Sequence, residues 1–321
     1  ATSGQSNLFG SLGASAWVVA SNAPSSIKNY AALLQQAGYP VWVCPGTEAG
    51  DTAAIQAAND AADGGIVQLS TGLFQVSSLT IDNCTLRGQF GAGTSGFPIS
   101  LTGTITVKST QSNQNYGYTG GRLFNLGIVQ AASQTTAAVK FLCETTASLD
   151  MNIRRAGTIA GNLTIAKSGV AQVGTAVHLV ADSSAGNSAA FGSCHFGPIS
   201  VYGFEYGLRD EYIGGSSYIS GNTFDLLDFE SCKNMIYLYG GGNHFYSVQM
   251  QPKTGDTNNT GIVIRSTSND NSFLSVFAWD WTPGMGYSLD VAAGALWNYV
   301  HGYFHGSYLR DLGTATMIIN K

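Results

Sequence analysis

The chain has 321 residues, a net charge of −5 and only 10% charged residues. This acidic balance argues against nucleic acid as a partner, because phosphate binding requires a basic face. No run of about 18 apolar residues occurs, and no charged segment precedes an apolar core, so neither a membrane span nor a signal peptide is expected. The 41 Gly residues suit short strands and tight turns.

The first 50 residues are predicted to form a separate N-terminal segment. Residues 24–37 have the pattern of a short amphipathic helix that ends at Gly38. Residues 39–44 are predicted to form a strand, which Pro45 and Gly46 close.

A second helix is predicted over residues 51–62, with Asp51 as its N-cap. A turn then leads into Ile66-Val-Gln-Leu, whose alternation marks a strand. We therefore divide the chain into an N-terminal segment (1–50), a capping helix with its turn (51–64) and a repeat domain (65–321). A helix at this boundary would cover the open edge of the domain that follows.

The repeat domain contains one phrase four times, an Asn two residues before an apolar residue that is Phe in three copies. The copies start at Asn222, Asn243, Asn271 and Asn298, in steps of 21, 28 and 27 residues. A second short strand follows each copy, and the turns between them are rich in Gly, Asn and Ser. This pattern predicts an all-β fold, a single-stranded parallel β-helix in which each repeat is one coil.

Stacked coils place like residues above one another, about 4.8 Å apart. The Asn residues of the phrase are predicted to form a hydrogen-bonded ladder at a turn. The apolar residues are predicted to form an internal column of Phe196, Phe224, Phe245, Phe273 and Val300. Both columns are interpreted as parts of the scaffold.

Two segments, one in the capping helix and one at the start of the repeat domain, carry a family resemblance. They are Gly50-Asp-Thr-Ala-Ala-Ile-Gln-Ala-Ala and the strand sequence that runs from Gly64-Gly-Ile-Val-Gln-Leu to Ile81. Together they resemble the opening of the pectate-lyase-like parallel β-helix superfamily, and residues 16–21 and 43–47 resemble bacteriophage tail proteins with this fold. The resemblance implies a right-handed β-helix, a polysaccharide substrate, a homotrimer and an extracellular or virion-tail location, with no cofactor.

Function is expected on the outer face of the coils, where one register brings acids, amides and aromatic rings together. Asp228 and Glu230 lie in line with Gln249 and Gln251 of the next coil, and Trp279 follows in the coil after that. Such a face suits a sugar polymer, because aromatic rings stack on pyranose rings and amides bind hydroxyls. The predicted substrate-binding residues are Gln249, Gln251, Trp279, Asp280, Trp281, Tyr246 and His305.

Asp228 and Glu230 are the first candidate for a catalytic pair. Residues i and i+2 of a strand are about 6.5 to 7 Å apart, which fits an inverting glycosidase better than a retaining one. In this interpretation Glu230 protonates the leaving oxygen and Asp228 activates water. Asp225 is a third candidate, and a pair drawn from neighbouring coils is as plausible as one from a single strand. The alternative is that these acids are simply solvated.

Two other clusters compete for the site. Glu205, Arg209, Asp210 and Glu211 are interpreted as a surface ion-pair group. Asp150 with Arg154 and Arg155 has the ingredients of lyase chemistry, but it lacks the several Asp residues of a calcium-dependent pectate lyase.

The remaining reactive residues give no sign of a metal site. The five His include no pair with HExxH spacing, and the five Cys are widely spaced with no CxxC. Buried thiols and no metal are therefore expected.

The predicted function is hydrolysis within a glycan chain by a glycoside hydrolase. The alternatives are a polysaccharide lyase of the same fold and a non-catalytic glycan-binding or structural phage tail protein. The aromatic coil at residues 296–306 either ends the stack or forms an interface.

Overall fold

The computed structural model describes residues 15–82, 84–88, 99–108, 120–145, 151–169, 171–281, 285–304 and 309–320, without the side chains of 151–156. The N-terminal elements are β1 (Ala16–Val19), α1 (Ser25–Gln36), β2 (Val41–Val43) and α2 (Glu48–Ala62). Neither helix in the described part of the chain is long and apolar enough to cross a membrane.

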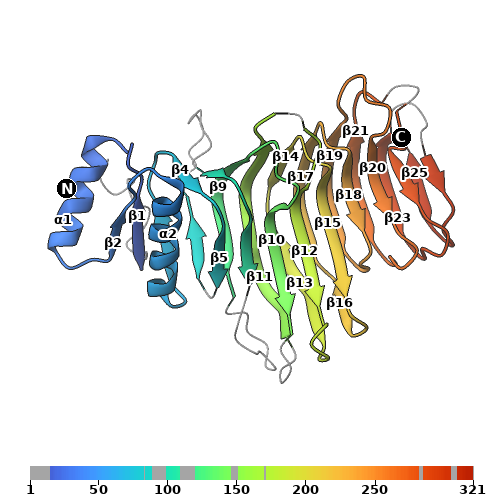
Figure 1. Cartoon of the computed structure of the whole chain (residues 1–321). Helices are drawn as coiled ribbons and strands as arrows, with labels where there is room; N and C mark the ends of the chain where they lie inside the picture. Colours follow the sequence, from blue (N-terminus) through green and yellow to red (C-terminus); the bar gives the residue numbers. More distant parts are fainter. Residues whose placement is uncertain are drawn as a thin grey trace.

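The described strands form two parallel sheets that run side by side along the molecule (Figure 1). The larger, 16-stranded sheet, here called sheet A, contains β1 and β2 together with β3 (Ile66–Leu69), β4 (Phe74–Val76), β6 (Thr85–Arg87), β7 (Ile99–Leu101), β9 (Arg122–Gln130), β11 (Met151–Lys167), β13 (Ala189–Phe196), β14 (Ile199–Tyr202), β16 (Ser217–Ser220), β17 (Thr223–Glu230), β19 (His244–Gln251), β21 (Ser272–Ala278), β23 (Tyr299–Phe304) and β25 (Met317–Asn320).

The 9-stranded sheet, here called sheet B, contains β5 (Leu79–Asp82), β8 (Ile105–Lys108), β10 (Ala137–Glu144), β12 (Thr175–Asp182), β15 (Tyr206–Ile213), β18 (Asn234–Leu238), β20 (Thr260–Ile264), β22 (Leu289–Val291) and β24 (Leu309–Asp311). Along the chain, one or more strands of sheet A alternate with single strands of sheet B, and the strands of successive coils pair in parallel. The predicted parallel β-helix is therefore confirmed.

The internal column consists of stacked Phe rings, as the repeat predicts. The rings of Phe196, Phe224, Phe245 and Phe273 are spaced 4.7, 4.7 and 4.4 Å apart and lie within 10° of parallel. Val300 pairs with Phe273, and Ile318 of β25 pairs in turn with Val300. Each buried ring contributes roughly 1.5 to 3 kcal/mol of transfer free energy, so the four rings together contribute roughly 6 to 12 kcal/mol.

The Asn ladder is also confirmed. Each buried Asn donates its side-chain amide to the Oδ1 atom of the Asn one coil further, over 3.1 Å in all three steps from Asn222 to Asn298. The same Oδ1 atoms accept the backbone N–H groups of Asn222, Asn243 and Asn271. The ladder thus satisfies polar groups that the corner would otherwise bury without partners.

The α-helix α2 covers the N-terminal end of the β-helix. The buried face of α2 consists of Ile55, Ala58 and Ala62. The sequence predicted Asp51 as the N-cap of α2, and this prediction is wrong. Thr47 is the N-cap, and its side chain accepts a hydrogen bond from the Gly50 N–H. A buried Asp one turn inside the helix has a different task, because it faces the first coil.

Polar side chains of α2 supply partners for the edge of that first coil. Asp51 accepts hydrogen bonds from the backbone N–H groups of Gly46 and Gln75, at 2.8 and 2.9 Å. Two further side-chain oxygens of α2 accept the N–H groups of Ser77 and Thr80, both at 3.0 Å. The helix therefore closes both the apolar interior and the unpaired strand edge.

Candidate functional site

The candidate site lies on the outer face of β17, β19 and β21, where the register aligns the predicted side chains. Asp228 pairs with Gln249, and Gln249 pairs with Phe277. Glu230 pairs with Gln251 in the neighbouring column. Buried and exposed residues alternate at the ends of these strands, so these side chains point away from the core.

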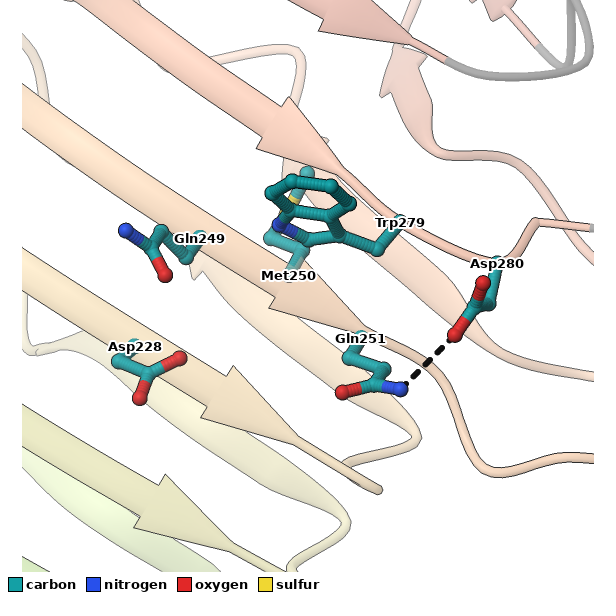
Figure 2. Close-up of a pocket in the computed structure, with 6 residues that line it drawn as sticks. All are labelled: Asp228, Gln249, Met250, Gln251, Trp279 and Asp280. Atoms are coloured by element: carbon teal, nitrogen blue, oxygen red, sulfur yellow. Dashed lines mark hydrogen bonds between the residues drawn. The ribbon is translucent and has the colours of Figure 1, made fainter.

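A hollow of about 290 Å³ opens at the ends of these strands. Its lining consists of Asp228, Gln249, Met250, Gln251, Trp279 and Asp280, and Figure 2 shows them arranged around it. The lining therefore combines carboxylates and carboxamides with one large exposed ring, all but one of them predicted from the sequence. Met250 was missed, because its alternation marks it as a core residue and the hollow reaches it between two outward neighbours.

The two carboxylates of the hollow are held differently. Asp280 accepts a hydrogen bond from the Gln251 side chain over 2.8 Å, which Figure 2 marks at the end away from Asp228. The backbone of Asp280 has φ of +54°, the left-handed region that non-glycine residues rarely adopt. This turn directly after β21 places the carboxylate beside the hollow.

Burial raises the pKa of the Asp228 carboxyl above its ordinary value by desolvation. Desolvation disfavours the charged form, so Asp228 holds its proton to a higher pH than a solvated acid. That property suits a proton donor rather than the base role predicted for Asp228. Glu230 stands one residue pair further along β17, exposed and outside the lining of the hollow.

Aromatic side chains extend the face beyond the hollow. Trp279 is 52% exposed, and its ring lies 6.1 Å from that of Phe277, within 21° of parallel. Tyr303 pairs with Phe277 one coil further and is also exposed. Tyr246 is exposed on β19 but does not line the hollow.

Trp281 is not part of the outer face. Its side chain is 1% exposed, and its indole N–H donates to the Gly286 carbonyl over 3.0 Å. The prediction failed because the strand alternation stops at β21, and the turn at Asp280 reverses which side the next residue faces. His305 lies outside the described residues.

Asp225 belongs to a different group, at the point where β17 changes its pairing from β13 to β14. Its carboxylate lies 2.9 Å from the Nε2 atom of His195. The alternation of buried and exposed residues in β17 breaks between Asp225 and Asp228, and Asp225 does not line the hollow.

The competing acidic cluster lies on sheet B and is only partly an ion-pair group. Glu211 lies 3.5 Å from Arg209 and 3.0 Å from His178. Asp210 is buried instead, and accepts hydrogen bonds from the backbone of Tyr239 and Gly240. Asp150 and the side chains of Arg154 and Arg155 lie outside the described residues.

Within the described residues, no group of three or more His, Cys, Asp or Glu side chains is arranged to hold a metal ion. All five Cys side chains are buried. Burial raises the pKa of the thiols of Cys44, Cys84 and Cys232 to about 12, chiefly by desolvation. These thiols therefore act as small apolar core groups near neutral pH.

Comparison with known proteins identifies no relative: no family model, no curated protein and no solved structure matches this chain.

Proposed function

We propose that this β-helix binds a polysaccharide on the outer face of sheet A and hydrolyses bonds within the glycan chain. The observation that carries the proposal is the hollow between β17 and β21, where Asp228, with its raised pKa, shares a lining with two carboxamides and Trp279. The ring offers a stacking surface for a pyranose, and the amides offer partners for its hydroxyls. The earlier resemblance to pectate-lyase-like β-helix proteins agrees with a glycan substrate.

In the proposed reaction, Asp228 protonates the glycosidic oxygen of the leaving sugar. The base that activates water is Asp280 or Glu230. Asp228 and Asp280 lie two strand spacings apart, about 10 Å in the stacking direction, and Glu230 lies about 6.5 to 7 Å along the strand. The separation of Asp228 from Glu230 lies in the 6.5 to 9.5 Å range of inverting enzymes, and that from Asp280 lies beyond its upper limit before the side chains adjust. Both exceed the 5 to 5.5 Å of retaining enzymes, so the proposed outcome is inversion of the anomeric centre.

The test measures new reducing ends released from a panel of bacterial capsular and plant polysaccharides. On a cleaved glycan, Asp228→Asn is expected to lower kcat by about 10²- to 10⁴-fold, the usual contribution of a general acid. Asp280→Asn and Glu230→Gln identify the base, because only the variant that removes it loses a similar factor. Trp279→Ala is expected to raise KM more than it lowers kcat.

The matched control is Glu144→Gln, which removes an exposed carboxylate from a strand of sheet B and should leave activity unchanged. Full activity of Asp228→Asn on a glycan that the unaltered protein cleaves would contradict the assignment. An unsaturated, ultraviolet-absorbing product would show that the reaction is elimination by a lyase and not hydrolysis. Glycan binding that depends on Trp279 without cleavage would leave a non-catalytic binding protein.

The assembly and location follow from the same resemblance. We propose a homotrimer in an extracellular or virion-tail setting, in which exposed aromatic residues of the last coils contribute to the contact between chains. Sedimentation of the purified chain measures the number of copies.

A further inference from the structure

A second group of reactive side chains crosses three successive coils outside the hollow. The Oγ1 atom of Thr158 in β11 lies 2.8 Å from the Nδ1 atom of His195 in β13. The Nε2 atom of the same imidazole lies 2.9 Å from the carboxylate of Asp225 in β17. A hydroxyl, an imidazole and a carboxylate are therefore joined in series by two contacts of hydrogen-bond length.

The order of these groups is that of a nucleophile, a base and a group that orients the base. When His195 carries its proton on Nε2, it donates to Asp225 and leaves the Nδ1 lone pair facing the Thr158 hydroxyl. Both distances fall within the range of about 2.6 to 3.2 Å over which such groups transfer protons. Constellations of this type arise on unrelated folds and are identified by geometry, not by sequence order.

The group is accessible from solvent. The side chains of His195 and Asp225 are 34% and 45% exposed, so a substrate can reach the imidazole edge. Next to Thr158, Gly157 has φ of +63° and open space where a Cβ atom would stand. The register of β11 against β13 shifts on both sides of Gly157 and Thr158. Interruptions of the register such as β-bulges re-aim side chains and are frequent beside active sites.

Another His–hydroxyl pair in the same column shows what is special about this one. His244 contacts the Ser272 hydroxyl through Nδ1 over 2.7 Å, so a hydroxyl–imidazole contact recurs in this column of stacked residues. His195 pairs with Thr223, and Asp225 stands two residues beyond that partner. His244 pairs with Ser272, and the residue two positions beyond is Leu274. Of these two His, only His195 has a carboxylate at this position.

We infer that Thr158, His195 and Asp225 form a second catalytic site, which transfers acyl groups from O-acyl esters such as acetylated sugar hydroxyls. The Thr158 oxygen attacks the ester carbonyl carbon while its proton passes to His195 Nδ1. The tetrahedral intermediate collapses, the ester C–O bond breaks, and His195 returns the proton to the leaving alcohol. Water then attacks the acyl-threonine ester with the same proton transfers, which releases the carboxylic acid and restores Thr158.

The test uses a fluorophosphonate probe, which phosphonylates an activated hydroxyl with loss of fluoride, followed by peptide mass spectrometry. The unaltered protein is expected to carry the label on Thr158, Thr158→Ser to keep it, and Thr158→Val to lose it. Asp225→Asn keeps the side-chain shape but removes the charge that orients His195. It is expected to slow labelling and p-nitrophenyl acetate hydrolysis by at least 10²-fold, as loss of the acid does in other triads.

The matched control is Ser272→Ala, which removes the hydroxyl of the pair without an acid and should change neither readout. Absence of label from Thr158 in the unaltered protein overturns the inference, as does equal labelling of Ser272. If Asp225→Asn is labelled and hydrolyses p-nitrophenyl acetate as fast as the unaltered protein, the inference is also overturned. The contacts among Thr158, His195 and Asp225 would then only stabilise the stack. The result is independent of glycan cleavage, since Asp228→Asn should still be labelled.

Discussion

At the scale of single residues, Asp210 has the clearest energetic consequence. The carboxylate is 1% exposed on β15, and it accepts the backbone N–H groups of Tyr239 at 2.5 Å and Gly240 at 2.8 Å. Desolvation outweighs these hydrogen bonds and raises the pKa of Asp210 to about 6. The sequence places Asp210 among charged neighbours, and only the corner formed 29 residues later explains why it is buried.

This pKa makes the stability of the fold depend on pH. Because the folded pKa lies above the ordinary value of 3.8, the contribution of Asp210 is fully present below pH 3.8 and is lost as pH rises through about 6. A shift of this size corresponds to about 3 kcal/mol. Asp210→Asn does not titrate. The unfolding free energy of the unaltered protein minus that of the variant should therefore fall by about 2.5 kcal/mol between pH 4 and 7.

Urea unfolding at several pH values in this range measures that difference, and other titrating groups cancel because both proteins share them. Asp182→Asn on the neighbouring strand β12 serves as a control for the loss of one carboxylate. Two curves of unfolding free energy that stay parallel from pH 4 to 7 would show that Asp210 does not couple protonation to folding.

At the scale of the elements, the corner before each ladder Asn has one backbone conformation. The residues at this position are Gly221, Gly242, Asp270 and Trp297, and all have φ between +58° and +69°. Gly adopts this region without strain and Asp tolerates it, whereas a bulky residue is strained there. Trp297 is also 64% exposed, so it recovers little free energy from burial.

Replacing Trp297 should therefore stabilise the fold. Trp297→Asn places at this corner a residue that tolerates left-handed backbone, and an increase of about 0.5 to 1 kcal/mol in unfolding free energy is expected. Leu312→Asn is the control, because Leu312 is 58% exposed and lies on a turn where no left-handed backbone is recorded. Thermal and urea unfolding of both variants check the prediction, which fails if Trp297→Asn is the less stable of the two.

At the scale of the whole molecule, repetition decides what can be read from the sequence. The period of the Asn phrase gives the stacking register, and the register gives the Phe column, the Asn ladder and the alignment of Asp228 with Gln249. The prediction for Trp281 was wrong because the left-handed turn at Asp280 directs the next residue inward, as Gly203 and Ser231 do in earlier coils, and strand alternation does not reveal such a turn. The N-cap of α2 was wrong because it depends on a local turn outside the repeats. The contacts of Asp225 with His195 and of His195 with Thr158 were not predicted. The register allows several neighbours for each side chain, and the rotamers that decide between them cannot be read from the sequence.

Stacking also determines how damage at one end should spread. Each coil contacts only its neighbours, so a solenoid responds locally to a change at its cap. Ile55 is fully buried on α2, next to the side chains that accept the N–H groups of Gln75, Ser77 and Thr80. Ile55→Ala removes about 2 to 5 kcal/mol of packing there, and the helix should then separate more often from the edge of β4 and β5.

Hydrogen exchange resolves this effect by position. In Ile55→Ala the amides of Gln75, Ser77 and Thr80 should lose protection, whereas those of β19, β21 and β23 should exchange as before. The control is Val248→Ala, a buried change in β19 that should reduce protection in β17 to β21 and leave the first coil unaffected. If both variants lost protection evenly along the chain, the β-helix would open as one cooperative unit, and α2 would stabilise the last coil as much as the first.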